Sequence, residues 1–377
     1  MKVTVLQENL ARGLSIVSRA VSPRSTLPVL SNILIASDEG RLRLSATNLE
    51  LGITCWIAAR IDEEGSTTVP ARTFADLVNT LPGDQVQLAL DVKTQNLHIK
   101  GGASNNDIKC IDAQEFPPLP VPEMDGAVAL NVVDFKEMIH QVAFAASTDE
   151  ARPVLMGVLM NVEKDNVTMV AADGFRLSVR KAQLSQPAAH PLNVIIPARA
   201  LNELARVAAD AEEPIYMVVP KNRGQVLFRV KDVEVVSQLI DGTFPDYQQI
   251  IPRNYKSRTL VSTASLLKAC KQAEIFAREG SNVARFDIKQ SNGEMQPSEV
   301  EISATSEETG KNETIVEATV DGGGVLIAFN VKFLREVLEV IKTPNVALET
   351  SAANAPGVIK PVGDDKFLHV IMPMHLG

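Results

Sequence analysis

The stretch RPVLMGVLMNVEKDNVTMVAADGFRL at residues 152–177 decides the architecture, because PVLSNILIASDEGRLRLSATNLELG at residues 28–52 repeats its pattern. A shift of 125 positions aligns the two without a gap and sets Asn48 against Asp173. Each copy alternates apolar and polar residues, passes through a polar turn and alternates again, which predicts a pair of antiparallel strands. A looser third copy follows at residues 283–306. The chain is therefore expected to contain three copies of one unit.

Two amphipathic helices are expected in each copy. The first helices show apolar residues at helical spacing along one face and are predicted at 6–22, 131–147 and 264–278. The second helices, two of them preceded by a proline that suits a helix start, are predicted at 71–79, 198–210 and 332–342. The predicted fold class is α+β, with two helices packed on antiparallel sheets in each of three tandem domains at 1–122, 123–253 and 254–377.

Length and composition are those of an ordinary globular protein. A chain of 377 residues and 40.8 kDa is expected to form two or three domains, each able to bury its own core. The N-terminal residues MKVTVLQENL contain no apolar segment of signal-peptide length, and no apolar run approaches a membrane span. The chain is therefore expected to be soluble and cytoplasmic, with no membrane partner.

The cysteines give little sign of a metal site or a disulfide framework. Cys55, Cys110 and Cys270 are odd in number, far apart and without CxxC spacing. This pattern favours reduced core thiols in a cytosolic protein, with metal ligands or a disulfide as the alternatives.

Charge is distributed unevenly along the chain. The six predicted helices together carry a formal charge of +3, whereas the whole chain carries −9, which leaves −12 for the remainder. Arg72, Arg199 and Lys332 recur at the same position of the second helix in all three copies. One reading is that these are ordinary solvated helix faces. The other is that the helices face a polyanion such as DNA and contact its phosphates without reading sequence.

An enzymatic role is not supported by any motif. His98, His140, His190, His369 and His375 show no metal-ligand spacing, and neither a serine elbow nor an HExxH sequence is present. The chain is therefore expected to be non-catalytic and to need no cofactor and no metal.

Five motifs, in order along the chain, resemble a known family. They are LPVLSNILI at 27–35, TTVPARTFADLV at 67–78, MVAADGFRLSV at 169–179, LIDGTFPDY at 239–247 and VIMPMHL at 370–376. With the threefold repeat, they make the whole chain similar to the bacterial replicative sliding clamps, the β subunits of DNA polymerase III. The resemblance implies a processivity factor, that is, a non-catalytic subunit of a DNA-directed DNA polymerase. It also implies a head-to-tail homodimer, closed as a ring of six domains that encircles and slides on double-stranded DNA.

The resemblance further implies a peptide-binding pocket between the second and third domains. Its partners would be the catalytic subunit of the polymerase, the clamp loader and repair proteins, which bind through short motifs containing glutamine, leucine and phenylalanine. Aliphatic and methionine side chains suit such an adaptable apolar slot. Taken one stretch at a time, the same residues would be read as core packing. The implied walls are Arg152, Val154, Leu155, Ala172, Gly174, Phe175, Leu177, Pro245, Ile250, Pro356, Val370, Met372 and Pro373.

Several positions differ from the family pattern. Relatives often carry other residues at Val154, Ala172, Phe175 and His375, and the residues found here make the expected pocket more apolar. Asn106 stands where an aromatic residue is common in the family, so the ring joint is expected to be less apolar than usual.

The resemblance also places basic residues toward DNA and apolar residues at the ring joint. The joint would use Ile108 of one subunit with Ile275 and Phe276 of the other. The expected DNA-facing residues are Arg24, Arg72, Arg199, Lys268, Lys271 and Lys332. A ring-shaped peptide-binding scaffold that never encircles DNA is the alternative function, and the basic character of the helices speaks against it.

Overall fold

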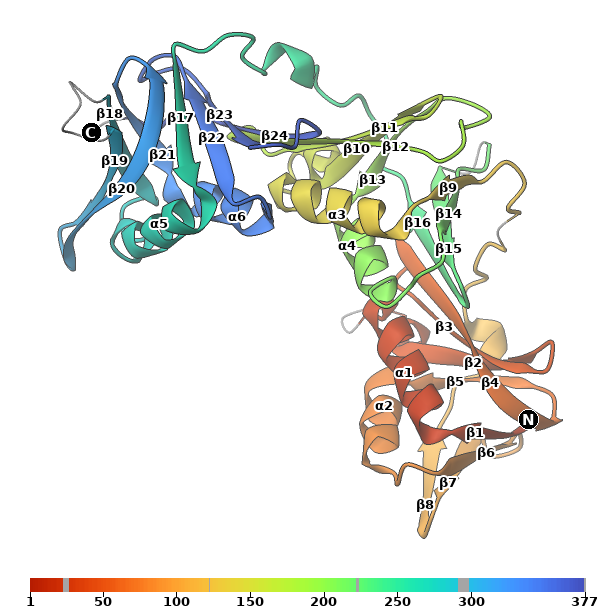
Figure 1. Ribbon diagram of the computed structural model, residues 1–377. Coiled ribbons are helices and arrows are strands. Elements are labelled where there is room, and N and C mark those ends of the chain that lie inside the picture. Colours follow the sequence, from red (N-terminus) through yellow and green to blue (C-terminus); the bar gives the residue numbers. More distant parts are fainter. Residues whose placement is uncertain (23–26, 122, 222–223, 291–297, 376–377) are drawn as a thin grey trace. The chain divides into compact units, whose positions relative to one another are not determined.

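The computed structural model describes residues 1–22, 27–121, 123–221, 224–290 and 298–375. They form two compact units, one made of Met1–Val132 with Arg199–Leu239 and the other of Val133–Ala198 with Ile240–Gly377. Each unit is built on its own antiparallel sheet with helices packed against it (Figure 1).

The sheet of the first unit runs in the order β8-β7-β6-β1-β4-β16-β15-β14-β9, and β3, β2 and β5 continue from β4. Burial alternates along strands such as β7, where Leu97 and Ile99 are buried and His98 between them is exposed. The strands are β1 (Lys2–Leu6), β2 (Asn32–Asp38), β3 (Arg41–Thr47), β4 (Leu51–Glu63), β5 (Ser66–Pro70), β6 (Gln85–Asp91), β7 (Asn96–Gly101), β8 (Ser104–Lys109), β9 (Val128–Leu130), β14 (Ile215–Val218), β15 (Gln225–Val230) and β16 (Val233–Gln238).

The sheet of the second unit runs in the order β13-β10-β11-β12-β24-β23-β22-β17-β20-β19-β18-β21. Its strands are β10 (Gly157–Glu163), β11 (Asn166–Ala172), β12 (Arg176–Gln183), β13 (Leu192–Pro197), β17 (Ser257–Ser262), β18 (Val283–Lys289), β19 (Ser298–Ser306), β20 (Gly310–Gly322), β21 (Val325–Asn330), β22 (Asn345–Thr350), β23 (Gly357–Pro361) and β24 (Phe367–Ile371).

Two strand pairs join consecutive repeats, and they follow the same rule. In the first junction, residues 51–55 of β4 pair with residues 233–237 of β16. In the second junction, residues 176–180 of β12 pair with residues 367–371 of β24. β12 corresponds to β4 by the shift of 125, and the two ladders then have the same register. The strands of the middle repeat are thus divided between the two sheets.

All six predicted helices are present in the described residues. Their buried faces are those expected from the spacing, for example Leu10, Leu14 and Val17 in the first helix. Figure 1 shows α5 and α6 side by side on one face of the second sheet. The helices are α1 (Gln7–Val17), α2 (Ala71–Thr80), α3 (Val132–Val142), α4 (Ala198–Val207), α5 (Thr263–Ala277) and α6 (Val331–Val340).

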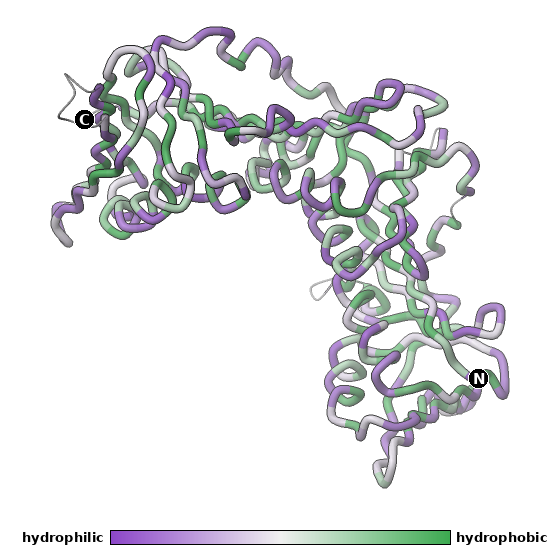
Figure 2. The backbone as a smooth tube through the Cα atoms, viewed as in Figure 1, coloured by the Kyte–Doolittle hydropathy of each residue, from purple (hydrophilic) through white to green (hydrophobic). Residues whose placement is uncertain are grey.

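The core is mainly aliphatic, and phenylalanines such as Phe74 and Phe329 are fully buried in it. Figure 2 shows hydrophobic residues along the strands and polar residues concentrated in the connecting loops. Cys55, Cys110 and Cys270 are free thiols, as predicted, although Cys110 is only partly buried. Burial raises the pKa of Cys270 to about 12, which keeps this thiol protonated. No described helix combines the length and apolar composition needed to cross a membrane.

Candidate peptide and DNA-binding sites

The turn between β11 and β12 is fixed by one carboxylate. Asp173 Oδ1 accepts hydrogen bonds from the backbone N–H of Phe175 at 2.9 Å and of Arg176 at 3.0 Å. Gly174 has a φ of 94°, a region that glycine occupies without a Cβ penalty, and a Cβ there would lie 3.0 Å from Arg152 Nη1. Phe175 is thereby held outward as a half-exposed side chain. Asp173 and Gly174 therefore form a turn.

An apolar cluster lies beside this turn in the second unit. Residues from six strands pack together, among them Ala172, Leu177 and Val370. Val154 and Leu155, from the 3-10 helix η5 (Pro153–Met156), pack against the cluster as partly buried residues. Five of the thirteen predicted pocket residues are therefore brought together in one cluster.

The remaining predicted pocket residues lie at the surface around this cluster. Phe175 is 56% exposed, Ile250 40% and Met372 38%. Met372 N–H donates to Phe175 O at 2.9 Å, so the turn and the segment after β24 are held together. Arg152, Gly174 and Pro245 are exposed, and Pro356 and Pro373 are partly buried. This arrangement is an apolar base with an exposed aromatic and aliphatic rim, which suits an extended peptide.

Arg152 carries charge to the edge of this rim. Its Nε lies 3.0 Å from Asp149 Oδ2 and its Nη1 donates to Asp173 O at 3.2 Å. The pKa of Asp149 is lowered, first by the backbone N–H of Ala151 and then by the Arg152 side chain.

Arg176 is a functional candidate that sequence reasoning missed. Its side chain is buried, and Nε lies 3.0 Å from Asp173 Oδ2. Nη2 donates to Phe144 O at 2.9 Å and Nη1 donates to Glu336 on α6. The guanidinium lies over the Phe333 ring, 4.2 Å from its centroid. No local signal in the sequence indicated it, because Arg176 stands in phase with the polar Ser178 and Arg180 in the alternation of β12, opposite Leu177 and Val179.

His369 is a second buried ionisable residue near Arg176. It is fully buried, stacks on Phe144 with ring centroids 5.6 Å apart, and its Nδ1 lies 2.7 Å from Ser178 Oγ. Burial, and secondly the charge of Arg176, lowers the pKa of His369 to about 3. His369 is therefore neutral near pH 7.

The described residues predicted to face DNA are exposed on helices. Arg72 lies on α2, Arg199 on α4 and Lys332 on α6, whereas Lys268 and Lys271 share α5. Arg72 lies 3.8 Å from Asp76, and Lys271 lies 3.0 Å from Glu339. Arg24 lies outside the described residues.

The residues predicted at the ring joint differ in accessibility. Ile275 on α5 is 55% exposed, and Phe276 beside it is partly buried. Ile108 on β8 is only 8% exposed, so it offers little area to a partner. Asn106 is partly buried and donates to Ser104 Oγ at 2.9 Å.

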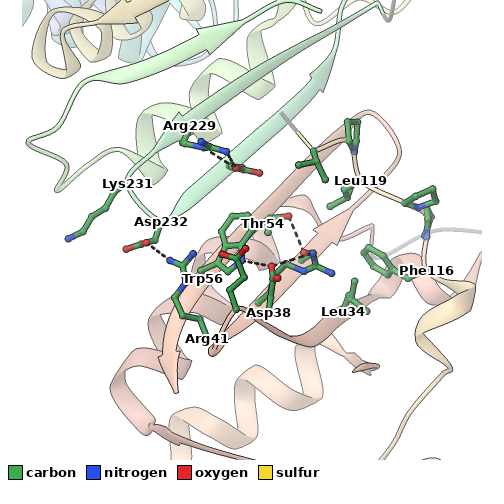
Figure 3. A pocket seen from close by; sticks show the side chains of 18 residues that line it. Leu34, Asp38, Arg41, Thr54, Trp56, Phe116, Leu119, Arg229, Lys231 and Asp232 are labelled. Carbon is green, nitrogen blue, oxygen red and sulfur yellow. Dashed lines mark hydrogen bonds and ion pairs between the residues drawn. The ribbon is translucent and has the colours of Figure 1, made fainter. Parts of the chain in front are cut away.

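A groove of about 700 Å³ in the first unit was not anticipated from the sequence. Figure 3 shows Leu34, Phe116 and Leu119 at one end and Arg41, Lys231 and Asp232 at the other. Trp56 Nε1 donates to Asp38 at 2.8 Å, while Arg41 lies over the Trp56 ring and pairs with Asp232 at 2.8 Å. The charged side chains that line the groove thus largely neutralise one another.

The comparisons with known proteins agree with the repeated architecture. Models of the N-terminal, central and C-terminal domains of the DNA polymerase III beta subunit match residues 1–120, 129–246 and 248–375. The chain belongs to the DNA polymerase III beta subunit family. A beta sliding clamp from Staphylococcus aureus is 35% identical over 383 residues, covering 99% of each chain.

Solved structures show the same relationship. The DNA polymerase sliding clamp of Bacillus subtilis is 30% identical and superposes with a TM-score of 0.93 over 100% of both chains. A sliding clamp from Pseudomonas aeruginosa, solved bound to griselimycin, is 28% identical, with a TM-score of 0.91 and full coverage of both chains. The chain therefore has the function of its family, that of a non-catalytic processivity factor in DNA replication, as the resemblance predicted.

Proposed function

We propose that two copies of this chain close head to tail into a ring around double-stranded DNA. The observation that carries the proposal is a third junction left open. β4 pairs with β16 and β12 pairs with β24, so the fourth strand of one repeat joins the last strand of the next. The corresponding strands β20 and β8 have no such partner in the described chain, because β8 pairs only with β7 and the segment 310–317 pairs only with β19.

The two closed junctions also give the register of the open one. β20 corresponds to β4 and β8 to β16, and the shared register then sets Gly310 opposite Ile108 and Lys311 opposite Asp107. Ile275 stands at the position of Phe144, which stacks against β24 in the second junction. Its exposure in the single chain is what an unclosed junction predicts. Because the contact is heterologous, it must close after a whole number of copies to avoid a filament.

The proposed ring has six domains, with the repeats at 1–122, 123–253 and 254–377. Its DNA contacts would be Arg72, Arg199, Lys332, Lys268 and Lys271, with Arg24 nearby. The support is that each described member is exposed on a helix. Such contacts bind phosphate without sequence preference, so the affinity is low and falls with salt. This ring is proposed to act in the cytoplasm.

The apolar cluster beside the turn at Asp173 is proposed to bind the polymerase, the clamp loader and repair proteins. An extended peptide carrying glutamine, leucine and phenylalanine would place its apolar side chains over Leu177 and Val370, with Phe175 and Met372 at the rim. The support is the buried apolar base surrounded by exposed apolar side chains.

Light scattering at micromolar protein tests the ring first. A mass near twice 40.8 kDa is expected, and Ile275→Asp should reduce it toward that of one chain. Leu49→Asp is the matched control, since Leu49 is an apolar residue of similar exposure in the turn before β4. The loaded protein should then stay on circular DNA and slide off the same DNA once linearised. Equal retention on both would contradict encirclement and leave the peptide-binding scaffold as the function.

A further inference from the structure

The second unit contains a chain of six ionic side chains of alternating charge. Lys271 lies 3.0 Å from Glu339, and Glu339 lies 2.8 Å from Arg335. Arg335 lies 3.6 Å from Glu336, which also pairs with Arg176 through its other oxygen. Arg176 ends the chain at Asp173, the carboxylate that holds the turn beside the candidate peptide site. The chain thus runs from α5 through α6 to that turn.

We propose that this ionic chain positions the peptide-binding turn, so that charge on the α5 surface modulates peptide affinity. The inference rests on the proposed peptide site. It assigns Glu336 and Arg176 as positioning residues, since their pairing fixes Asp173 and, through it, the backbone of Phe175. Phe175 O in turn receives the N–H of Met372, so both sides of the rim depend on the same carboxylate.

The first unit shows that the same turn can form without the ionic chain. Asn48, the counterpart of Asp173, accepts from the N–H of Glu50 at 3.1 Å and of Leu51 at 2.8 Å. The same turn and the same junction therefore exist with Leu51 at the position of Arg176. The arginine is not a requirement of the fold, which points to a role at the site beside it.

A glutamate occupies the same position of the second helix in both units, but it has different ion-pair partners. Glu203 on α4 occupies the position of Glu336 on α6, and it pairs at 3.3 Å with Arg19, in the 3-10 helix η1 (Ser18–Ala20). Arg19 occupies the position of Phe144. In the first unit this glutamate thus links two helices, whereas in the second unit it pairs with the first residue of β12, the strand that follows the turn.

The ionic chain also predicts in which direction the charge of Lys271 should change peptide affinity. Arg335 is also held by Glu274 on α5, which lies 2.6 Å from its Nε. Without Lys271, Glu339 depends on Arg335 alone and draws the Nη end of that guanidinium away from Glu336. Glu336 then pairs more fully with Arg176, and the turn is held more firmly. Loss of the Lys271 charge, or its engagement by a phosphate, should therefore tighten peptide binding. Coupling through such networks is typically modest, so the expected change is about twofold.

The test measures the affinity of a fluorescein-labelled peptide Gln-Leu-Asp-Leu-Phe by fluorescence anisotropy on the full chain. Glu336→Gln should weaken binding about tenfold, because the uncharged amide holds Arg176 less well. Glu203→Gln, the same change at the matching position of the first unit, should leave the affinity unchanged. Amide exchange at Phe175 should quicken in Glu336→Gln, a local response that general destabilisation would not confine to this turn.

Lys271→Gln should tighten binding about twofold, and this effect should vanish in the Glu336→Gln background. Lys268→Gln removes the same charge from the same helix, and Lys268 has no ion pair among the described side chains. It should leave peptide affinity unchanged while weakening DNA retention as Lys271→Gln does. Unchanged binding in Glu336→Gln, or equal effects of the two lysine variants, would overturn the inference alone. Failure of the wild-type chain to bind the peptide would overturn the proposed peptide site as well.

Discussion

The two closed junctions of this chain share a backbone and differ in chemistry. β4 with β16 and β12 with β24 have the same register, and each is preceded by a turn held by one side-chain oxygen, from Asn48 in the first and Asp173 in the second. The turn and the ladder thus need only backbone hydrogen bonds and one short polar side chain. The side chains around them were free to diverge.

Polar groups occupy the second junction where the first is apolar. The pair Ile53 and Val235 of the first junction corresponds to Ser178 and His369 in the second. Leu51 likewise corresponds to Arg176. A buried ionic group costs desolvation energy that only a complete set of partners offsets, so it is weak support for stability in itself. We infer that the polar groups of the second junction serve the peptide site proposed beside it.

The two junctions also differ in whether a connecting segment of the polypeptide covers them. In the first unit, Leu119 from the segment after β8 packs with Phe116 against Val29 and Leu30. A Cβ on Gly52 would lie 2.8 Å from Leu119 Cδ2, so Leu119 covers Gly52. In the second unit Leu177 occupies the position of Gly52. The first junction is thus covered by its own chain at the point where the second is proposed to receive a peptide.

Arg176→Leu, which converts the second junction to the residue of the first, should have the largest effect. The partly buried Asp173 and Glu336 would lose their shared partner, the buried Arg176, and breaking a buried ion pair typically costs about 3–5 kcal/mol. Urea unfolding monitored in the second unit should show this loss. Peptide affinity should fall more than tenfold.

Arg19→Leu is the matched control in the first unit. Arg19 pairs with Glu203 near the surface, where an ion pair contributes about 0–1 kcal/mol. If both variants lost the same stability, the contrast between the junctions would be wrong. A stable Arg176→Leu protein with full peptide affinity would show that leucine serves the second junction as well as the first.

Low pH should weaken the second unit selectively, because His369 titrates there and Val235 takes its place in the first. The folded pKa of about 3 lies below the unfolded value near 6.5, so the unfolded chain binds the proton more readily. The stability that neutral His369 contributes is fully present above pH 6.5 and is lost as the pH falls toward 3. The slope approaches about 1.4 kcal/mol per pH unit, or roughly 3 kcal/mol between pH 6.5 and 4.

Urea titrations at several pH values, with amide exchange to separate the units, measure this slope. The double variant Ser178→Ile with His369→Val restores the pair of the first junction and should remove most of the slope. A slope that survives in the double variant would assign the acid sensitivity to the carboxylates instead.

The fold could be predicted from the sequence because it depends on periodicity and repetition. The alternation in 152–177 and its copy in 28–52 specify strands whose register follows from which face is apolar. α6 begins and ends within two residues of the predicted limits, since its apolar spacing marks the buried face. α1 begins one residue after the predicted start but ends at Val17, five residues before the predicted limit, where a 3-10 turn follows. The division of the middle repeat between two sheets could not be predicted, because strand pairing between repeats leaves no local pattern.

The candidate site was predicted only in its apolar part. Leu177, Val370 and Val154 were named from the resemblance, and they pack together. Arg176 and Glu336 were missed because 160 positions separate them, and no local pattern indicates that an arginine on β12 meets an acid on α6. Pairings of this kind are decided by tertiary structure alone.

Gly52→Ala should test how tightly the first junction is covered. Gly52 has an ordinary strand backbone, so the cost is steric and arises from the 2.8 Å approach of Leu119. Overpacking of this kind costs about 1–3 kcal/mol, and urea unfolding of the first unit should show it. Leu119→Ala should rescue part of the loss, since the methyl group then fills the space that leucine leaves. Additive losses would mean that Leu119 does not press on Gly52 in solution.

The smallest effect should come from the junction that only a second copy can close. In the proposed ring the shared register would set Lys311 opposite Asp107, and both side chains are exposed in the single chain. Exposed ion pairs contribute little, so Lys311→Glu should weaken the dimer about threefold in dissociation constant, measured by analytical ultracentrifugation. Asp107→Lys should restore the affinity when combined with it, because opposite charges again face each other across the strands. Arg285→Glu, a change of the same sign on β18, serves as the control and should leave the dimer unchanged. If the double variant is weaker than either single variant, β20 and β8 meet in another register, and the third junction does not follow the rule of the first two.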